Sequence, residues 1–246
     1  MRFSLCVICG NEIEHIEAML AALAPAFDEL SLVRAIGNRQ PDETWAKAKE
    51  WCAANGKEFL FSDYRNEDST RDWDHVDSFA KARNQAFRQA TGDWLLWADC
   101  DDQAHTMESL RPLLLALPEE IIMARFLYDV RGTGKALFRE RAIRKTAFAA
   151  GRIWHHDVHE NLLLNRGDGH VDLAGPTWVH SPKVIKRENR NRNLRILFNE
   201  TKDAATQFFY IHQEYYCSGM KDAAIEYGKI ALGFSNLPPA FRYEAL

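Results

Sequence analysis

Short apolar runs alternate with segments in which apolar residues recur at helical spacing over the first part of the chain. Such runs are typical of buried strands, and the helical spacing is typical of amphipathic helices. We expect strands at residues 3–9, 30–36, 58–61 and 94–98, and helices at residues 11–23, 44–55 and 78–90. This order predicts a mostly parallel sheet covered by helices, with ligands bound beyond the carboxyl ends of the strands.

The later part of the chain contains strand patterns first and helical patterns afterwards. Further strands are expected at residues 121–128, 135–138, 158–164 and 170–173. From residue 186 the pattern is helical, and residues 204–217 and 222–232 are expected to form two amphipathic helices around Ser218-Gly219. We therefore predict a domain built around a sheet over residues 1–185 and a small all-helical region over residues 186–246.

The helical region resembles one tetratricopeptide helix-turn-helix unit, with Ala223, Ala224 and Tyr227 at packing positions. A single repeat of this kind cannot bury its own apolar face. We expect it to dock on the first domain, to pair with a second copy of the chain in a homodimer, or to continue in further residues.

Composition and charge limit the classes of function. The chain has 246 residues, of which 46% are hydrophobic and 27% charged, enough for a large core with a solvated surface. The formal net charge of −4 argues against general nucleic-acid binding, which needs a basic face. One local basic patch fits either a solvated helix face or a phosphate-facing surface. It consists of Lys183, Lys186, Arg187, Arg190, Arg192 and Arg195.

The five cysteines are scattered, which predicts free thiols in a reducing, cytoplasmic compartment. We expect no secretory leader and no membrane span, because no apolar run approaches the ~20 residues that a span needs. Cys6 and Cys9 form a C-x-x-C motif, but side chains three apart on a strand point to opposite faces. We interpret both as core thiols rather than as a redox or metal pair.

Three carboxylates, Asp99, Asp101 and Asp102, follow the apolar strand at residues 94–98. Like charges this close repel one another, and a divalent cation with oxygen ligands would relieve that repulsion. Mn²⁺ and Mg²⁺ commonly bind through one or two carboxylates plus substrate phosphates, which suits the departure of a nucleoside diphosphate. The alternative is a solvated turn, since Asp is also common at the start of a helix.

Four stretches in this order resemble glycosyltransferase family 2 of the GT-A fold. They are residues 4–12, residues 79–84 with Ala82-Arg83-Asn84, residues 91–102, and Val158-His159-Glu160. More narrowly, the chain resembles the bacterial subgroup with tetratricopeptide-like helices after the catalytic domain. The resemblance implies an α/β fold of the Rossmann-like GT-A type, a mostly parallel sheet flanked by helices and followed by a small all-α appendage.

The resemblance also implies roles for individual residues. Asp101, with Asp99 and His180, would bind Mn²⁺ or Mg²⁺, and Asp102 could join them. Asp99 would also face the ribose or sugar of a nucleotide-sugar donor. The remaining donor-binding residues that the resemblance implies are Asn11, Glu12, Asp77, Arg83 and Asn84.

Glu160 is the candidate general base, because transfer with inversion needs one carboxylate to take a proton from the acceptor. His159 would orient Glu160 or bind the metal. A zinc site using His155 and His159 is the alternative, but that spacing requires a helix, and the segment shows no helical face.

One position departs from the family pattern. The family usually has an Asp at the end of its second strand that reads the nucleotide base, and this chain has Arg34 and Ala35 there. Asp42 or Asp63 could substitute. The departure affects the assignment of uridine more than it affects the fold.

We therefore predict an inverting, metal-dependent glycosyltransferase that moves a sugar from a nucleotide-diphosphate donor, a UDP-sugar, to an acceptor hydroxyl or other nucleophile. The acceptor classes left open are protein, peptide, glycan, lipid-linked sugar and modified phage DNA. The alternatives are a nucleotide-sugar-binding or tetratricopeptide-type interaction protein with degenerate catalysis, and a sugar nucleotidyltransferase.

Overall fold

The computed structural model describes residues 1–130, 135–180, 187–200 and 203–244. The chain divides into two compact units. The sheet unit comprises Met1–His155 and Leu162–Pro182, and the helical unit comprises His156–Asn161 and Lys183–Leu246. Residues 156–161 thus belong to the helical unit, although the residues on both sides of them belong to the sheet unit. The domain boundary expected between residues 185 and 186 stays a prediction.

A mixed eight-stranded sheet forms the centre of the sheet unit, in the order β3-β2-β1-β4-β7-β6-β10-β5. Its first strands are β1 (Phe3–Cys9), β2 (Glu29–Arg34), β3 (Glu58–Asp63) and β4 (Trp94–Trp97), which run parallel to one another. The others are β5 (Asp102–His105), β6 (Ile121–Val130), β7 (Lys135–Arg144) and β10 (Gly169–His180). Because β10 also runs parallel to β6, the sheet is mostly parallel, which confirms the predicted fold class.

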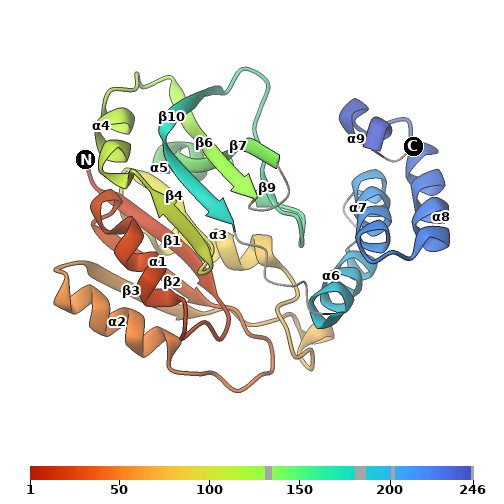
Figure 1. Ribbon diagram of the computed structural model, residues 1–246, viewed down its shortest axis with the longest axis horizontal. Coiled ribbons are helices and arrows are strands. Elements are labelled where there is room, and N and C mark those ends of the chain that lie inside the picture. Colours follow the sequence, from red (N-terminus) through yellow and green to blue (C-terminus); the bar gives the residue numbers. More distant parts are fainter. Residues whose placement is uncertain (131–134, 181–186, 201–202, 245–246) are drawn as a thin grey trace. The chain divides into compact units, whose positions relative to one another are not determined.

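The side chains of β1 alternate between two apolar layers, because successive residues of a strand face opposite sides of the sheet. Leu5 and Val7 pack in the layer of α1 (Ile16–Leu23) and α2 (Thr44–Ala54). Cys6 and Ile8 pack in the layer of α3 (Phe79–Gln89) and α5 (Lys145–Ala149). Figure 1 shows α1 and α2 on one face of the sheet and α3 on the other.

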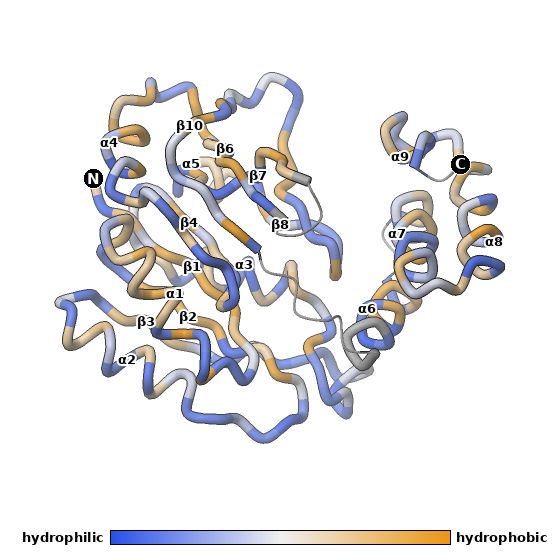
Figure 2. The backbone as a smooth tube through the Cα atoms, in the orientation of Figure 1, coloured by the Kyte–Doolittle hydropathy of each residue, from blue (hydrophilic) through white to orange (hydrophobic). Residues whose placement is uncertain are grey.

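All residues of β1 are buried, and Figure 2 shows this strand as mostly hydrophobic. Cys6 and Cys9 are buried free thiols in different apolar layers, which confirms that they do not form a pair. By contrast, the long connection between β3 and α3 is mostly hydrophilic in Figure 2. Its structure depends on hydrogen bonds, as described below.

The prediction of a strand at residues 158–164 is wrong in its length. Within the described residues it is reduced to β9 (Asn161–Leu162), which pairs with β8 (Trp154–His155). His156 and His159 adopt positive φ angles of 66° and 56°, outside the extended region that a strand requires. The chain therefore turns twice between β8 and β9.

Other elements differ from the expectation at their ends. The helix expected from residue 11 begins at Ile16, because the preceding residues are held in a turn. Strand β5 was not expected, since its residues, Asp102–His105, form no apolar run. Strand β10 extends well beyond the expected residues 170–173, through a stretch containing Gly175 and Pro176. Residues 131–134, between β6 and β7, lie outside the described residues.

The helical unit contains α6 (Arg187–Asn199), α7 (Ala204–Cys217), α8 (Lys221–Leu232) and α9 (Pro239–Glu244). The two helices predicted around Ser218-Gly219 are confirmed as α7 and α8, and Gly219 has the positive φ of 73° that suits this turn. Ala205, Phe209 and Ala231 form its small apolar core with Leu237. The tetratricopeptide assignment stays a prediction, and Lys183 and Lys186 of the basic patch lie outside the described residues.

Candidate functional site

The acidic cluster forms a tight turn at the carboxyl end of β4. The backbone N–H of Asp102 donates to the carbonyl oxygen of Asp99 over 3.0 Å, and the N–H of Asp99 donates to Asp102 Oδ2 over 3.1 Å. These reciprocal bonds close the turn between β4, a fully buried strand, and β5. The turn therefore presents its side chains at the sheet edge where parallel sheets bind ligands.

Asp102 is buried and pairs with Arg141 of β7. Arg141 Nη1 lies 2.9 Å from Asp102 Oδ2, and neither side chain is exposed. The guanidinium carbon also lies 3.9 Å from the ring centre of Trp97 and 4.7 Å from that of Tyr128. The cation is thus held among aromatic faces, which attract it and exclude water. Nothing in the sequence pattern singled out Arg141.

Asp101, Asp102 and His180 come together at the end of this turn. Their ligand atoms lie within 4.8 Å of one another. His180 Nδ1 is 3.5 Å from Asp102 Oδ1 and 4.0 Å from Asp101 Oδ1. His180 reaches the turn because the antiparallel pairing of β10 with β5 places it opposite Asp102.

This group fits a divalent cation. Asp102 Oδ1 and His180 Nδ1 are both buried and lack a hydrogen-bond partner among the described residues. Buried polar atoms normally have partners, so two such atoms facing one another are expected where an ion binds. Carboxylate oxygens suit Mg²⁺ and Mn²⁺, and imidazole is a common ligand of transition-metal ions. Asp99, expected among the metal ligands, lies outside this group.

The charges in the site shift the pKa values of Asp102 and His180. Burial raises the pKa of Asp102, but the charge of Arg141, the contact with His180 and the N–H of Asp99 outweigh it, and the pKa falls below its ordinary value. The contact with Asp102 raises the pKa of His180 against the opposing effect of burial, and the charge of Asp101 adds to the rise. Asp102 is therefore favoured in its charged form, and His180 is influenced by the acidic groups around it.

Arg83 connects Asp99 to two tryptophans. It comes from α3, which begins after Ser78, whose side chain accepts a hydrogen bond from the N–H of Lys81. Arg83 Nη2 lies 3.4 Å from Asp99 Oδ1, and the guanidinium carbon lies 4.2 Å from the ring centre of Trp97 and 5.1 Å from that of Trp154. Arg83 is 2% exposed, so it acts at Asp99 as a largely desolvated charge.

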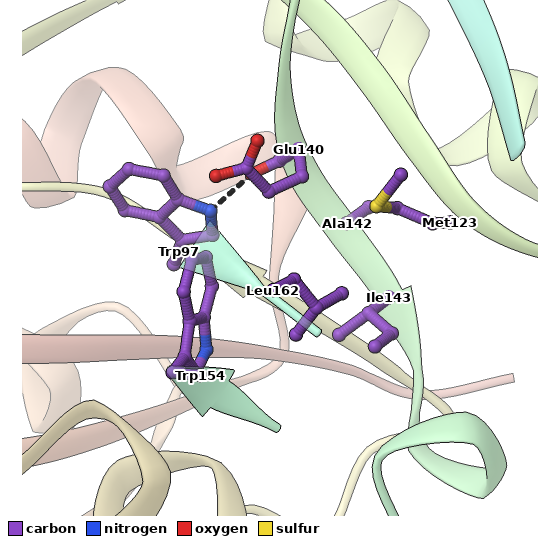
Figure 3. A pocket seen from close by; sticks show the side chains of 7 residues that line it. All are labelled: Trp97, Met123, Glu140, Ala142, Ile143, Trp154 and Leu162. Carbon is purple, nitrogen blue, oxygen red and sulfur yellow. Dashed lines mark hydrogen bonds between the residues drawn. The ribbon is translucent and has the colours of Figure 1, made fainter. Parts of the chain in front are cut away.

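Trp97 and Trp154 form one wall of a small hollow, which Figure 3 shows from close by. Their rings meet edge to face, with ring centres 5.4 Å apart. Trp97 Nε1 donates to the carbonyl oxygen of Glu140 on β7. The remaining lining side chains are mostly apolar, from Met123, Ala142, Ile143 and Leu162. This hollow therefore belongs to the core that supports Arg83.

Asn84, expected in the nucleotide pocket, is bonded through both ends of its amide to Trp154. Asn84 Nδ2 donates to the carbonyl oxygen of Trp154, and the N–H of Trp154 donates to Asn84 Oδ1, both over 2.9 Å. Asn84 is 5% exposed. In this structure the side chain holds β8 against α3.

Asn11 and Glu12 lie in a turn after β1 that is bonded to the residues before α2. Asn11 Nδ2 donates to the carbonyl oxygen of Gln40, and the N–H of Asp42 donates to Asn11 Oδ1. The N–H of Glu12 donates to Thr44 Oγ1 over 2.8 Å. The hydroxyl of Thr44 therefore contacts Glu12 and Asp42.

Asp77 organises the hydrophilic connection between β3 and α3. Its Oδ1 accepts from the hydroxyl of Tyr64 over 2.7 Å, and its Oδ2 accepts from the N–H of Glu67 and from the hydroxyl of Thr70. Asp77 is 7% exposed. These bonds give a buried carboxylate three donors and fix the loop that leads into α3.

Arg34 pairs with Asp63 where β2 and β3 end side by side. The two residues are register partners, and Arg34 Nε lies 2.7 Å from Asp63 Oδ1. Asp63 is one of the two residues expected to replace the carboxylate that reads the nucleotide base. Its carboxylate is therefore already paired with the guanidinium of Arg34. Asp42, the other, accepts from the N–H and hydroxyl of Thr44.

His159 and Glu160 belong to the helical unit. His159 Nε2 lies 2.9 Å from Glu214 Oε1 of α7, and its ring stacks on Tyr210 with centres 4.6 Å apart. No described helix contains His155 or His159, so the helical spacing of a zinc pair is not formed. Glu200 and Glu214, which contact this segment, were not found by sequence analysis, because both lie in ordinary helical patterns.

Among the described residues, no helix is long and apolar enough to cross a membrane.

The order of these features matches a known family. The model of glycosyl transferase family 2 matches residues 4–227. The chain belongs to glycosyl transferase family 2. The match runs from β1 through the acidic turn and the His159-Glu160 segment into α8.

Solved glycosyltransferases share the fold. S. aureus TarS in complex with UDP-GlcNAc is 14% identical with a TM-score of 0.58, over 99% of this chain and 83% of that one. The mannosyltransferase PcManGT of Pyrobaculum calidifontis, in complex with GDP-Man and Mn²⁺, is 14% identical with a TM-score of 0.56, over the same shares of the two chains, 99% and 83%. At these identities the likeness concerns the fold, which is that of GT-A glycosyltransferases.

One curated relative is similar in sequence. A tetratricopeptide-repeat-containing protein of Synechococcus elongatus is 37% identical over 100 residues, which are 41% of this chain and 20% of that protein. This chain therefore spans about a fifth of the length of that relative. The activity and partners of a longer protein do not follow from this match.

Proposed function

We propose that this family 2 glycosyltransferase transfers a sugar with inversion from a nucleotide-diphosphate donor, a UDP-sugar, to an acceptor nucleophile, assisted by Mn²⁺ or Mg²⁺. The observation that carries the proposal is the group of Asp101, Asp102 and His180 at the carboxyl end of β4. A cation bound there would neutralise the charge that develops on the departing diphosphate.

The residues around that group have different proposed roles. Asp101 and His180 have partly exposed side chains, and Asp102 supplies a buried ligand atom beside the ion pair with Arg141. Asp99, with its side chain 37% exposed and Arg83 behind it, is the candidate contact for the ribose or sugar. We propose that Asn11 and Glu12 border the nucleotide, since their turn also follows the carboxyl end of a strand.

Asp77 and Asn84 support the donor site indirectly in this proposal. Both are buried, and their polar atoms already accept or donate bonds to the protein. Asp77 would hold the loop before α3, and Asn84 would hold Trp154 behind Arg83. Recognition of the nucleotide base would differ from the family pattern, because Arg34 and Ala35 stand where the family has an Asp, and Arg34 pairs with Asp63.

Glu160 is the proposed general base, and His159 is the proposed group that orients it. The support is the chemistry of inversion, which requires a carboxylate to take the acceptor proton. We propose a protein, peptide or glycan as the acceptor, and pairing of the α6–α9 helices between two copies remains a proposal. The five free cysteines support a cytoplasmic location.

Calorimetric titration with UDP, in the presence and absence of Mn²⁺, tests the proposal. We expect binding that depends on the metal and that disappears on chelation with EDTA. Parallel titrations with GDP and CDP show which nucleotide base the site prefers. Absence of metal-dependent binding for every nucleoside diphosphate would refute the proposed site.

A further inference from the structure

Two buried glutamates of the helical unit contact the segment that carries the candidate base. Glu200 Oε1 lies 3.3 Å from His156 Nδ1 and accepts from the N–H of Asp157 over 3.3 Å. Glu214 Oε1 lies 2.9 Å from His159 Nε2. The side chains of Glu200 and Glu214 are 1% and 10% exposed, so both carboxylates are largely removed from water.

Burying these carboxylates is costly unless they are well bonded, so their partners indicate what they do. The carboxylate of Glu200 contacts His156 and Asp157. Glu214 Oε1 also accepts from Asn193 Nδ2 over 2.8 Å, which fixes the carboxylate from α6 while it holds His159. Helices α6 and α7 therefore provide a rigid frame for the imidazole of His159.

The backbone of the segment needs such a frame. His156 and His159 both adopt left-handed φ angles, 66° and 56°, which are sterically unfavourable for residues other than glycine. Tyr210 stacks on the ring of His159, with centres 4.6 Å apart, and meets the ring of His156 at its edge. The segment is thus held at both histidines in a conformation that it would not adopt alone.

We propose that Glu214, with Glu200 as a second support, is a positioning residue for catalysis: it holds His159 and thereby sets the direction of Glu160. This inference rests on the proposed role of Glu160 as general base. A carboxylate oxygen of Glu214 accepts from His159 Nε2–H, and this bond fixes the orientation of the ring. Glu160 follows His159 in the chain. A change in the backbone at His159 therefore changes the direction of the Glu160 side chain.

The test compares Glu214→Ala and Glu214→Asp with Glu226→Ala and Glu226→Asp, at an exposed glutamate of α8. The aspartate variant keeps the charge and the helix but withdraws the carboxylate from His159 by one methylene. The readouts are hydrolysis of the best UDP-sugar, Mn²⁺-dependent UDP binding, and amide hydrogen exchange of residues 156–161.

We expect both Glu214 variants to lower kcat for hydrolysis by roughly 10- to 100-fold, as for a misplaced catalytic group. UDP affinity should stay unchanged, and exchange should become faster in residues 156–161 but not in α7. The Glu226 variants should behave as the parent protein. If Glu214→Ala does not fold, Glu214→Asp decides the outcome.

Two results separate the inference from the proposed function. Glu214 variants with the kcat of the Glu226 variants, alongside an inactive Glu160→Gln, would overturn the positioning role and leave the base assignment intact. An active Glu160→Gln variant would instead overturn the base assignment on which the inference rests.

Discussion

Arg141 Nη1 lies 2.9 Å from Asp102 Oδ2 inside the sheet unit, and neither side chain is exposed. Removing one partner of a buried ion pair leaves the other charge without compensation. We expect Arg141→Met to lower the free energy of unfolding by about 3–5 kcal/mol. Urea unfolding monitored by circular dichroism measures this change.

Two further variants test the reason for that loss. Arg125→Met removes a cation from an exposed pair with Asp172 and should cost about 0–1 kcal/mol. The double variant Arg141→Met/Asp102→Asn should recover much of the stability, because the buried charge is removed. A double variant no more stable than Arg141→Met would contradict this electrostatic explanation.

Asp101→Asn and His180→Gln should weaken Mn²⁺-dependent UDP binding without unfolding the protein. Both residues are partly exposed and offer ligand atoms to the proposed ion. We expect the apparent Mn²⁺ affinity to fall by at least roughly tenfold, the smaller effect typical of residues that only support metal ligands. Manganese titration at fixed UDP measures it, with Asp222→Asn on α8 as the control. Parent-like Mn²⁺ dependence in both variants would remove these residues from the site.

Asn84→Ala should destabilise the protein. The change leaves the N–H and carbonyl oxygen of Trp154 buried without their partner, at about 1–3 kcal/mol for each group. Asn55→Ala, which removes an exposed amide bonded to Trp51, is the control and should cost much less. Urea unfolding and UDP titration are measured together. Unchanged stability with weaker UDP binding would instead assign Asn84 to the donor.

Alkylation should modify Cys217 selectively in the native protein. Cys217 is exposed, whereas the other four cysteines are buried. Burial raises the pKa of Cys9 to about 12 and that of Cys52 to about 11, so these thiols hold little of the reactive thiolate. Raising the pH from about 7 to about 9 should leave Cys9 unlabelled, because its pKa of about 12 lies above this range.

Peptide mass spectrometry after iodoacetamide treatment gives the site of labelling. In urea all five cysteines should react, which controls for reagent access. Labelling of Cys9 in the folded protein at pH values near neutral would show that β1 opens more readily than its burial indicates.

The sequence predicts the elements whose apolar pattern is complete. Strands β1 and β4 are buried on both faces, so each appears as an unbroken apolar run, and α7 was placed within its observed bounds. Strand β5 could not be found in this way, because it lies at the edge of the sheet and consists of Asp102, Gln103, Ala104 and His105. Its register is determined by pairing with a distant segment.

The site was predictable only where its residues are adjacent in sequence or match a family motif. Asp101 and Asp102 follow a buried strand, and their chemistry can be inferred from that placement. Arg141 lies among charged residues of β7, a pattern typical of an exposed strand, and only tertiary pairing shows that it is buried. The pattern of α7 likewise predicts Glu214 on the polar face of an amphipathic helix, and only the tertiary structure shows that it is buried against His159.

Residues 156–161 have a consequence for how such a protein can be dissected or recombined. They belong to the helical unit but are bracketed on both sides by the sheet unit, so no single cut in the chain separates the two units. A truncated chain ending after β10 would retain His159 without Glu214 and Tyr210. We expect the α6–α9 region to be inherited together with its transferase, rather than exchanged as an independent module between enzymes.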